Sequence, residues 1–186
     1  EVDSKAVRSG VRHVRIDKRN WVWAVHRGVV VYDGISWRRF GTTLEDINFS
    51  DTRLTYEDRE GNIWVGLWGG GLIFCDPASV QRFSEEDGLP DREVRNLAAD
   101  RKGRIWIGTM GGMARWDRGG LVPVQVDSKF SNSSILALVI DRVGRVWGGN
   151  DKGEVFRWDG DELEVMQIPL SENEIFSLVV KSIIIP

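Results

Sequence analysis

The amino-acid sequence predicts an all-β fold built from about four repeated units, and three observations predict it. First, a tryptophan recurs at intervals of 41, 42 and 41 residues along the 186-residue chain. Second, each of these tryptophans follows an aspartate by six residues, with a glycine or an asparagine midway between them. Third, each unit contains four short runs in which apolar and polar residues alternate. Four short strands in about 42 residues are typical of one blade of a β-propeller.

The repeated motif predicts a tight turn followed by a buried strand. An aspartate carboxylate can accept hydrogen bonds from backbone N–H groups one or two residues further along the chain. Glycine tolerates the positive φ of the last turn position, and Asn20, which replaces it in the first copy, is the next most tolerant residue type. We therefore expect the aspartates and glycines to shape the turns and the tryptophans to be core wedges. The motif residues are Asp17, Trp23, Asp58, Gly61, Trp64, Asp100, Gly103, Trp106, Asp141, Gly144 and Trp147.

The four strands of each unit follow from the same alternation and from the turn residues between them. In the third unit, the first strand is Val94–Ala99 and the second is 104–107, on either side of the Asp100 turn. A glycine-marked turn then leads to a third strand that ends at an aspartate. These third strands are predicted at Val29–Tyr32, Leu72–Cys75, 113–116 and Glu154–Trp158. The fourth strands are predicted around 36–40, Val80–Phe83, 121–126 and 163–168.

The phase of the repeat predicts how the chain is divided. The blades are expected at 11–40, 41–84, 85–126 and 127–170, all within one propeller domain. Residues 1–10 are interpreted as the tail of a preceding unit. Residues 171–186 are interpreted as the truncated start of a fifth blade, because 175–180 resembles 135–140 but the turn that should follow is missing. An open stack of this kind would leave sheet edges uncovered, so we expect the chain to be part of a longer propeller.

The composition excludes several classes of function. Lys and Arg number 25 against 28 Asp and Glu, which gives a formal charge of −3, and no basic stripe stands out along the sequence, so we predict no nucleic-acid partner. The two histidines, His13 and His26, are too few for a metal site, and Asp159–Glu162 lacks the spaced oxygen ligands of a calcium loop. No G-x-S-x-G motif occurs. We therefore predict no cofactor, no metal and no catalytic residue.

The third copy of the motif resembles a known repeat family. Asp100 to Asp117 reads D-R-K-G-R-I-W-I-G-T-M-G-G-M-A-R-W-D, which is similar to the two-component regulator propeller repeat. The segment from Asp58 to Asp76 is nearly as close, and E-D-G-L-P at 86–90 resembles the link between blades of that family. The first and fourth copies are looser, because Asn20 replaces the glycine and 147–149 lacks the V-G-T ending.

This resemblance implies a function at the level of the family. Its members are mostly bacterial receptors whose propellers lie in the periplasm and whose output is a histidine kinase or a diguanylate cyclase located elsewhere in the protein. The chain is then expected to be a non-catalytic sensory propeller on the extracytoplasmic side of the inner membrane. Its expected partners are an oligosaccharide or another small ligand, and the remaining blades and signalling domains of the same receptor. A second copy of the chain, forming a homodimer, is a further candidate partner.

Four residues are candidates for binding a ligand, because in propellers the loops between the second and third strands and between blades usually form the ligand face. Trp68 lies in such a loop, outside the repeat consensus, and an exposed tryptophan can stack on a sugar ring. It could equally pack on a neighbouring blade. His26, Arg27 and Asn150 lie in equivalent loops of other units.

Three alternatives remain open on the sequence alone. The Asp-x-x-Gly-x-x-Trp turn is similar to the Asp-box of sialidases, but the tyrosine nucleophile would have to be Tyr32 or Tyr56. Streptogramin lyase-like propellers share a similar repeat, and their catalytic histidine would have to be His13 or His26. A propeller that serves only to dock other proteins is the third alternative.

Overall fold

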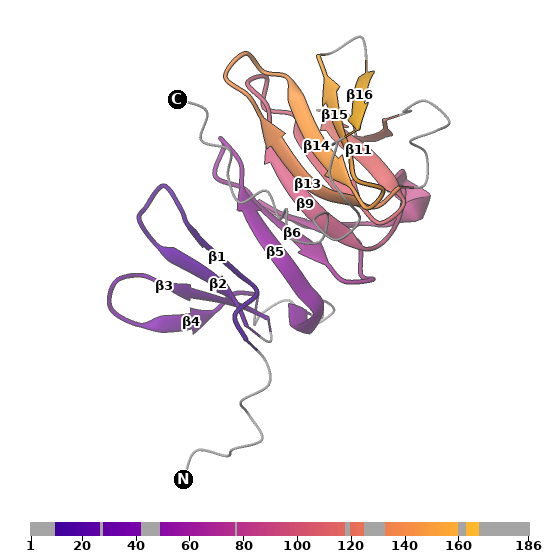
Figure 1. Cartoon of the computed structure of the whole chain (residues 1–186). Coiled ribbons are helices and arrows are strands. Elements are labelled where there is room, and N and C mark those ends of the chain that lie inside the picture. The colour runs from indigo at the N-terminus through magenta and orange to yellow at the C-terminus, as the bar shows by residue number, and fades with distance from the viewer. Residues whose placement is uncertain are drawn as a thin grey trace.

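The computed structural model describes residues 10–26, 28–41, 49–76, 78–117, 120–124, 133–159 and 163–167. Within them the chain forms four antiparallel sheets, each of four strands hydrogen-bonded in sequence order (Figure 1). The predicted all-β fold is confirmed. The predicted fifth blade at 171–186, and residues 1–9 of the predicted N-terminal tail, lie outside the described residues. In the described part of the chain, no helix has the length and apolar character needed to cross a membrane.

The strands follow one pattern in all four sheets. The first sheet contains β1 (His13–Ile16), β2 (Val22–Val25), β3 (Val29–Tyr32) and β4 (Trp37–Arg39). The second contains β5 (Thr52–Glu57), β6 (Ile63–Leu67), β7 (Leu72–Cys75) and β8 (Val80–Phe83). The third contains β9 (Val94–Ala99), β10 (Ile105–Thr109), β11 (Gly112–Asp117) and β12 (Gly120–Pro123). The fourth contains β13 (Ile135–Ile140), β14 (Val146–Asn150), β15 (Glu154–Trp158) and β16 (Leu163–Gln167).

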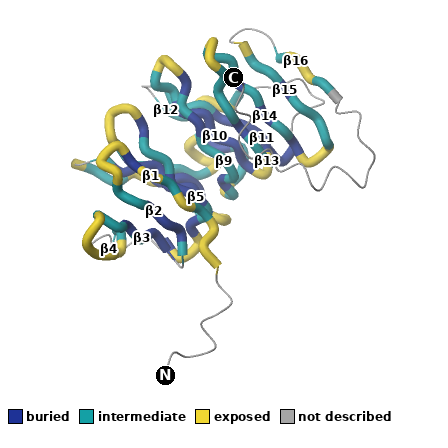
Figure 2. Tube along the Cα trace, turned by 60° about the vertical axis from the view of Figure 1, so that its left-hand side comes forward, coloured by how far each residue is buried: buried dark blue, intermediate teal, exposed yellow. Residues whose placement is uncertain are grey.

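The sheets pack face to face, and the first strand of each contacts the first strand of the next, from β1 through β5 and β9 to β13. A hydrophobic cluster fills each junction between neighbouring sheets, and each cluster contains one motif tryptophan. Trp23 belongs to the cluster between the first and second sheets, Trp64 to the next and Trp106 to the third. Figure 2 shows the buried segments between the sheets and the exposed turns at their ends. Trp23, Trp64 and Trp106 are thus buried between sheets, whereas Trp147 is half-buried.

Each motif aspartate organises its turn through both carboxylate oxygens. Oδ2 accepts a hydrogen bond from the indole Nε1–H of the tryptophan six residues later, at 3.0 to 3.1 Å in all four sheets. Oδ1 of Asp100 accepts hydrogen bonds from the backbone N–H groups of Lys102 (2.9 Å) and Arg104 (3.1 Å). Asn20 has φ 65° and is the one non-glycine residue with positive φ in the described segments. The predicted turn is confirmed, and the bond to the indole adds a link that the sequence did not indicate.

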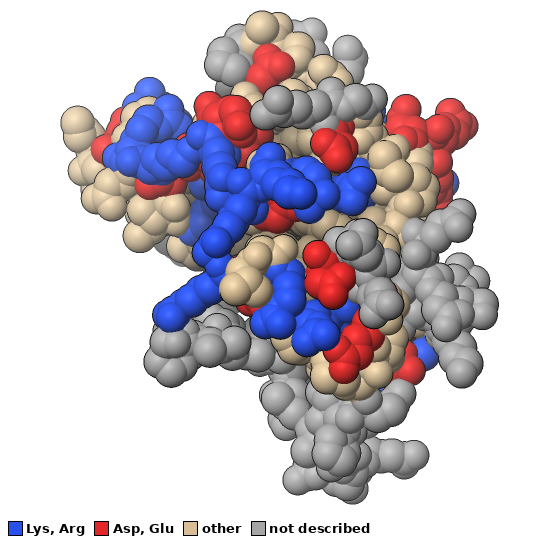
Figure 3. All heavy atoms as spheres, turned by 90° about the horizontal axis from the view of Figure 1, so that it is seen from above, with Lys and Arg blue, Asp and Glu red and all other residues tan. Residues whose placement is uncertain are grey.

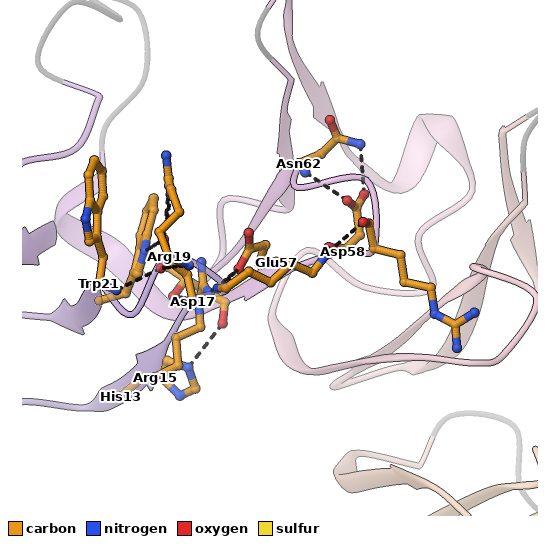
Figure 4. Close-up of polar contacts among 12 residues, drawn as sticks. His13, Arg15, Asp17, Arg19, Trp21, Glu57, Asp58 and Asn62 are labelled. Atoms are coloured by element: carbon orange, nitrogen blue, oxygen red, sulfur yellow. Dashed lines mark hydrogen bonds and ion pairs between the residues drawn. The ribbon is translucent and has the colours of Figure 1, made fainter. Parts of the chain in front are cut away.

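Polar side chains also tie neighbouring sheets together. Lys18 Nζ donates to the backbone carbonyls of Asp58 (3.0 Å) and Arg59 (2.5 Å), and Arg59 Nη1 donates to the carbonyl of Arg101 (2.6 Å). Figure 4 shows the first junction, where Arg15 of β1 points toward Glu57 of β5, and their charged atoms lie 3.5 Å apart. Each of these contacts joins repeat positions about 42 residues apart.

Candidate functional site

The end of the propeller opposite the aspartate turns carries the loops that join the second and third strands. In three sheets the first residue of this loop donates its backbone N–H to the carbonyl of the residue immediately before the sheet's first strand. The pairs are Trp68 to Asp51 (2.8 Å), Met110 to Glu93 (3.1 Å) and Asp151 to Ser134 (3.1 Å). These hydrogen bonds fix each loop against the start of its own inner strand. We call this the loop end of the propeller.

Arginine recurs at this end, five residues before the motif aspartate, as Arg12, Arg53 and Arg95. The fourth repeat has Leu136 at the same position. In the second, third and fourth sheets the strand register shifts at this residue, which is left without a partner on the second strand. A β-bulge of this kind bends the strand and redirects the side chain of the extra residue. Arg53 and Arg95 therefore occupy positions at which the backbone departs from the regular ladder.

The guanidinium groups of Arg53 and Arg95 lie over the ring of Trp68, with Cζ at 4.8 and 5.4 Å from the ring centroid. Both arginines also approach Glu93, whose Oε1 is 3.6 Å from Arg53 Nη1 and 2.8 Å from Arg95 Nε. Trp68 is 52% exposed, whereas the side chains of Arg53 and Arg95 are 27% and 19% exposed. Cations over an indole face are held by the negative potential of the ring. We call Arg12, Arg53, Arg95, Glu93 and Trp68 the arginine cluster.

The electrostatics of the cluster are dominated by positive charge. Burial lowers the pKa of Arg53, repulsion from Arg95 and Arg12 lowers it further, and attraction to Glu93 opposes them. A guanidinium remains protonated at neutral pH despite such a shift. Arg53 and Arg95 thus share the carboxylate of Glu93, and Arg12 adds a third positive charge near Arg53.

An open depression of about 240 Å³ runs between β1, β5 and β9 beside these arginines. Its lining residues are Arg12, His13, Arg53, Leu54, Thr55, Tyr56, Arg95, Asn96 and Leu97. His13 Nε2 lies 3.1 Å from the carbonyl oxygen of Thr55 and therefore carries the proton of that contact, since a carbonyl only accepts. Burial lowers the pKa of His13, with a further contribution from Arg15, so the imidazole is neutral at pH 7.

The predicted ligand residues are placed differently by the structure. Trp68 lies at the loop end and contacts Arg53 and Arg95. His26 is half-buried in its turn, where its backbone N–H donates to the carbonyl of Gly28 (2.9 Å). Arg27 lies outside the described residues.

Asn150 is buried, with 6% exposure. Its Oδ1 accepts from the backbone N–H groups of Lys152 (3.1 Å) and Glu154 (2.9 Å), and its Nδ2 donates to Glu154 Oε2 (2.7 Å). The amide is therefore engaged in its own hairpin turn, and we assign it a structural role.

The sequence analysis missed the arginines and Glu93. The available signal was the recurrence of Arg12, Arg53 and Arg95 at one position of three repeats. A second group of positively charged side chains, at the end of the propeller that carries the aspartate turns, was also not predicted. Figure 3, which views the molecule from above Figure 1, shows Lys and Arg side chains forming a band on that face. The exposed basic residues of the aspartate turns are Lys18, Arg19, Arg59, Arg101, Lys102 and Arg142.

Neither Cys75 nor a metal cluster adds a reactive centre in the described part of the chain. Cys75 is buried, and burial, assisted by the charge of Asp76, raises the pKa of its thiol to about 11. Among the described residues, no three His, Cys, Asp or Glu side chains are grouped so as to hold a metal ion.

Comparison with known proteins gives a family match and a shared fold. The model of the two component regulator propeller family matches residues 88–111. Among curated proteins, none matches this chain. The extracellular domain assigned to a hybrid two component system from B. thetaiotaomicron shares the fold over 86% of this chain and 23% of its own, with a TM-score of 0.74 and 20% identity. The extracellular domain assigned to a one component system of the same organism shares it over 87% and 25%, with a TM-score of 0.73 and 20% identity.

A lyase has a similar fold. Virginiamycin B lyase from Staphylococcus aureus matches 87% of this chain and 57% of its own, with a TM-score of 0.68 and 14% identity. At such identities the likeness shows the fold alone. The chain also spans only about a quarter of the length of the two sensor domains. The match at residues 88–111, together with the four-bladed fold, confirms the predicted resemblance: the chain is a β-propeller segment that carries a two component regulator propeller repeat.

Proposed function

We propose that this chain is the non-catalytic, ligand-recognising propeller of a bacterial two-component sensor and that it lies outside the cytoplasm. One observation carries the proposal: a regulator propeller repeat at 88–111 occurs in a chain that shares its fold with two extracellular sensor domains. The arginine cluster supports it, since it offers an exposed, chemically distinctive surface at the loop end. Trp68 contributes to this surface as a partner of the two arginines.

Sensing places a thermodynamic requirement on this surface. A ligand shifts a receptor between two states only by the difference between its affinities for them. The proposed ligand must therefore bind one arrangement of the receptor better than another, and a hundredfold preference corresponds to about 2.7 kcal/mol.

The proposal is tested on the whole protein in its native membrane. Its signalling output, phosphotransfer or cyclic dinucleotide synthesis, is measured with and without a panel of oligosaccharides, and each added compound is recovered and analysed by mass spectrometry. We expect one class of compound to change the output and to be recovered intact. Chemical conversion of that compound, or an output that responds only to another protein, would contradict the proposal.

Lyase activity is the second candidate, because the fold of virginiamycin B lyase covers 87% of this chain. Its test is incubation of the protein with quinupristin, which has been crystallised with that lyase, followed by mass spectrometry. The histidine required by the lyase-like reading would have to be His13 or His26. Ring opening that is lost in His13→Ala or His26→Ala would establish an enzyme and displace the sensor proposal.

A further inference from the structure

We propose that the arginine cluster binds an anionic group of the ligand, a carboxylate or a sulfate, between the guanidinium groups of Arg12, Arg53 and Arg95. This inference rests on the proposed function, because it names the chemistry of the ligand that the propeller recognises. It starts from an excess of donors. Three guanidinium groups carry fifteen N–H donors by their chemistry, at five each, whereas the shared carboxylate of Glu93 has about four acceptor positions.

The contact between Glu93 and Arg95 leaves part of this capacity unused. Arg95 Nε and Glu93 Oε1 are buried and only 2.8 Å apart, yet neither atom has a hydrogen-bond partner of acceptable geometry. Buried polar atoms are nearly always satisfied, and this poorly aligned ion pair leaves Arg95 Nε able to donate to a second acceptor at the depression. The oxygens of a bound anion would supply acceptors at this position.

The backbone supports a specific role for the arginine position. A β-bulge removes regular ladder contacts, and here it recurs in three successive sheets at the residue five positions before the motif aspartate. In the fourth sheet that residue is Leu136, whose side chain is 49% exposed and carries no charge. The bulge thus occurs in the second, third and fourth sheets, whereas the arginine occurs in the first three. This difference limits the anion site to the depression between β1, β5 and β9.

Trp68 is a positioning residue for this site. Its ring lies beneath the guanidinium groups of both Arg53 and Arg95. A guanidinium held by its face keeps its in-plane N–H groups available, and their fork matches the two oxygens of a carboxylate or of a sulfate. The ring thus restrains two like-charged side chains that would otherwise move apart.

The size of the depression suggests that the anionic group sits on a small unit. A volume of about 240 Å³ is below the range of roughly 300–1,000 Å³ that drug-sized ligands occupy. Tyr56 and Asn96 line the same depression and offer neutral hydrogen-bonding groups beside the cations. This combination fits a charged sugar unit, either a uronic acid or a sulfated sugar.

The test is isothermal titration calorimetry of the protein with three probes at constant ionic strength: sodium D-glucuronate, D-glucose and inorganic sulfate. We expect glucuronate or sulfate to bind and glucose to give no heat. Binding of glucuronate alone assigns a carboxylate, and binding of sulfate alone assigns a sulfate group. Because hydrogen bonds to charged groups contribute about 1.5–3 kcal/mol, Arg53→Gln and Arg95→Gln should each weaken binding by roughly ten- to hundredfold.

Arg142→Gln is the matched control, since this arginine is exposed in the aspartate turn of the fourth sheet, at the other end. Its affinity for the probes should equal that of the unmodified protein, and the near-UV circular dichroism of every variant should be unchanged. Trp68→Ala should weaken binding severalfold and Trp68→Phe should restore most of it, because a phenyl ring still attracts guanidinium groups.

Binding of glucose as tightly as glucuronate would overturn the inference, and so would unchanged anion affinity in the folded Arg53→Gln, Arg95→Gln double variant. These outcomes are separate from the test of sensing. A receptor whose output responds to a neutral oligosaccharide, and whose propeller binds no anion, would keep the proposed function and refute this site.

Discussion

At the scale of single residues, each motif aspartate links a turn to the core. Asp100 is 2% exposed and accepts hydrogen bonds from the Trp106 indole (3.1 Å) and from Arg104 Nε (2.6 Å), besides two backbone N–H groups. A charged, buried side chain of this kind is stable only because every acceptor is used. The sequence predicted the turn and the buried indole separately. It could not predict their hydrogen bond, because that bond depends on how the hairpin brings residues six apart together.

The substitution Asp100→Asn should destabilise the fold by about 3 kcal/mol, because the new amide NH₂ would face two N–H donors and the charge-assisted bonds would be lost. Urea unfolding followed by tryptophan fluorescence measures this change. The exposed Asp51, substituted by Asn, is the control and should stay within about 0.5 kcal/mol of the original protein. Equal midpoints for the two variants would show that the carboxylate of Asp100 contributes nothing beyond its shape.

At the scale of elements, the second strands of the second and third sheets carry a glycine where the first strand of the next sheet passes. A Cβ on Gly66 would lie 2.8 Å from Val94 Cγ1, and one on Gly108 would lie 2.8 Å from Ile135 Cγ2. The sequence marked these glycines as part of the repeat, but the reason for them is a contact between two sheets. The bulges at Arg53 and Arg95 were missed for a similar reason, since alternation in the sequence continues through a bulge without a visible mark.

Gly108→Ala should therefore lower stability by roughly 1–3 kcal/mol through overpacking against Ile135. Gly149 occupies the same position of the fourth repeat, where the nearest atom to a new Cβ among the described residues is 3.9 Å away. Gly149→Ala is thus a matched control and should be nearly neutral, as measured by thermal unfolding. A larger loss for Gly149→Ala than for Gly108→Ala would contradict the packing explanation.

At the scale of the whole molecule, ionised aspartates make stability depend on pH. Burial raises the pKa of Asp100, but hydrogen bonds from Trp106 and Arg104 outweigh it and lower the pKa overall. The pKa values of Asp17 and Asp141 are lowered in the same way, because the effect of burial is outweighed by hydrogen bonds to the carboxylate. Hydrogen bonds from the backbone of Ser36 and Ile35 and from Arg38 lower the pKa of Asp33 to about 2. A folded pKa below the unfolded value contributes stability above about pH 4, which is lost as the pH falls through the folded value.

We therefore expect the thermal midpoint to be nearly constant between pH 5 and 7 with respect to these aspartates, and to fall steeply between about pH 4 and pH 2. Differential scanning calorimetry across this range measures the effect. The fall should be shallower in Asp141→Asn, which removes one of the contributing groups. A midpoint that is the same at pH 7 and pH 2.5 would show that these carboxylates keep ordinary pKa values in the fold.

The repeat and its strands were predicted well from the sequence, because both depend on local residue patterns that recur about every 42 residues. The candidate site was predicted only in part. Trp68 was found because it departs from the repeat, whereas Arg12, Arg53 and Arg95 come together only when three blades are stacked. Asn150 was predicted to bind a ligand from its place in the loop, which gave no sign that its amide is turned inward.

The hydrogen bonds from Lys18 and Arg59 to backbone carbonyls of the following sheet bear on how repeats can be added to such a chain. The receiving group is a carbonyl, which every amino acid possesses, so the link makes no demand on the side chains of its neighbour. A duplicated or exchanged repeat can therefore form these hydrogen bonds whatever its side chains, provided that its turn has the same backbone shape. The basic residues after the first two motif aspartates, Lys18 and Arg59, therefore join neighbouring sheets in a way that leaves the side chains of each blade free to vary.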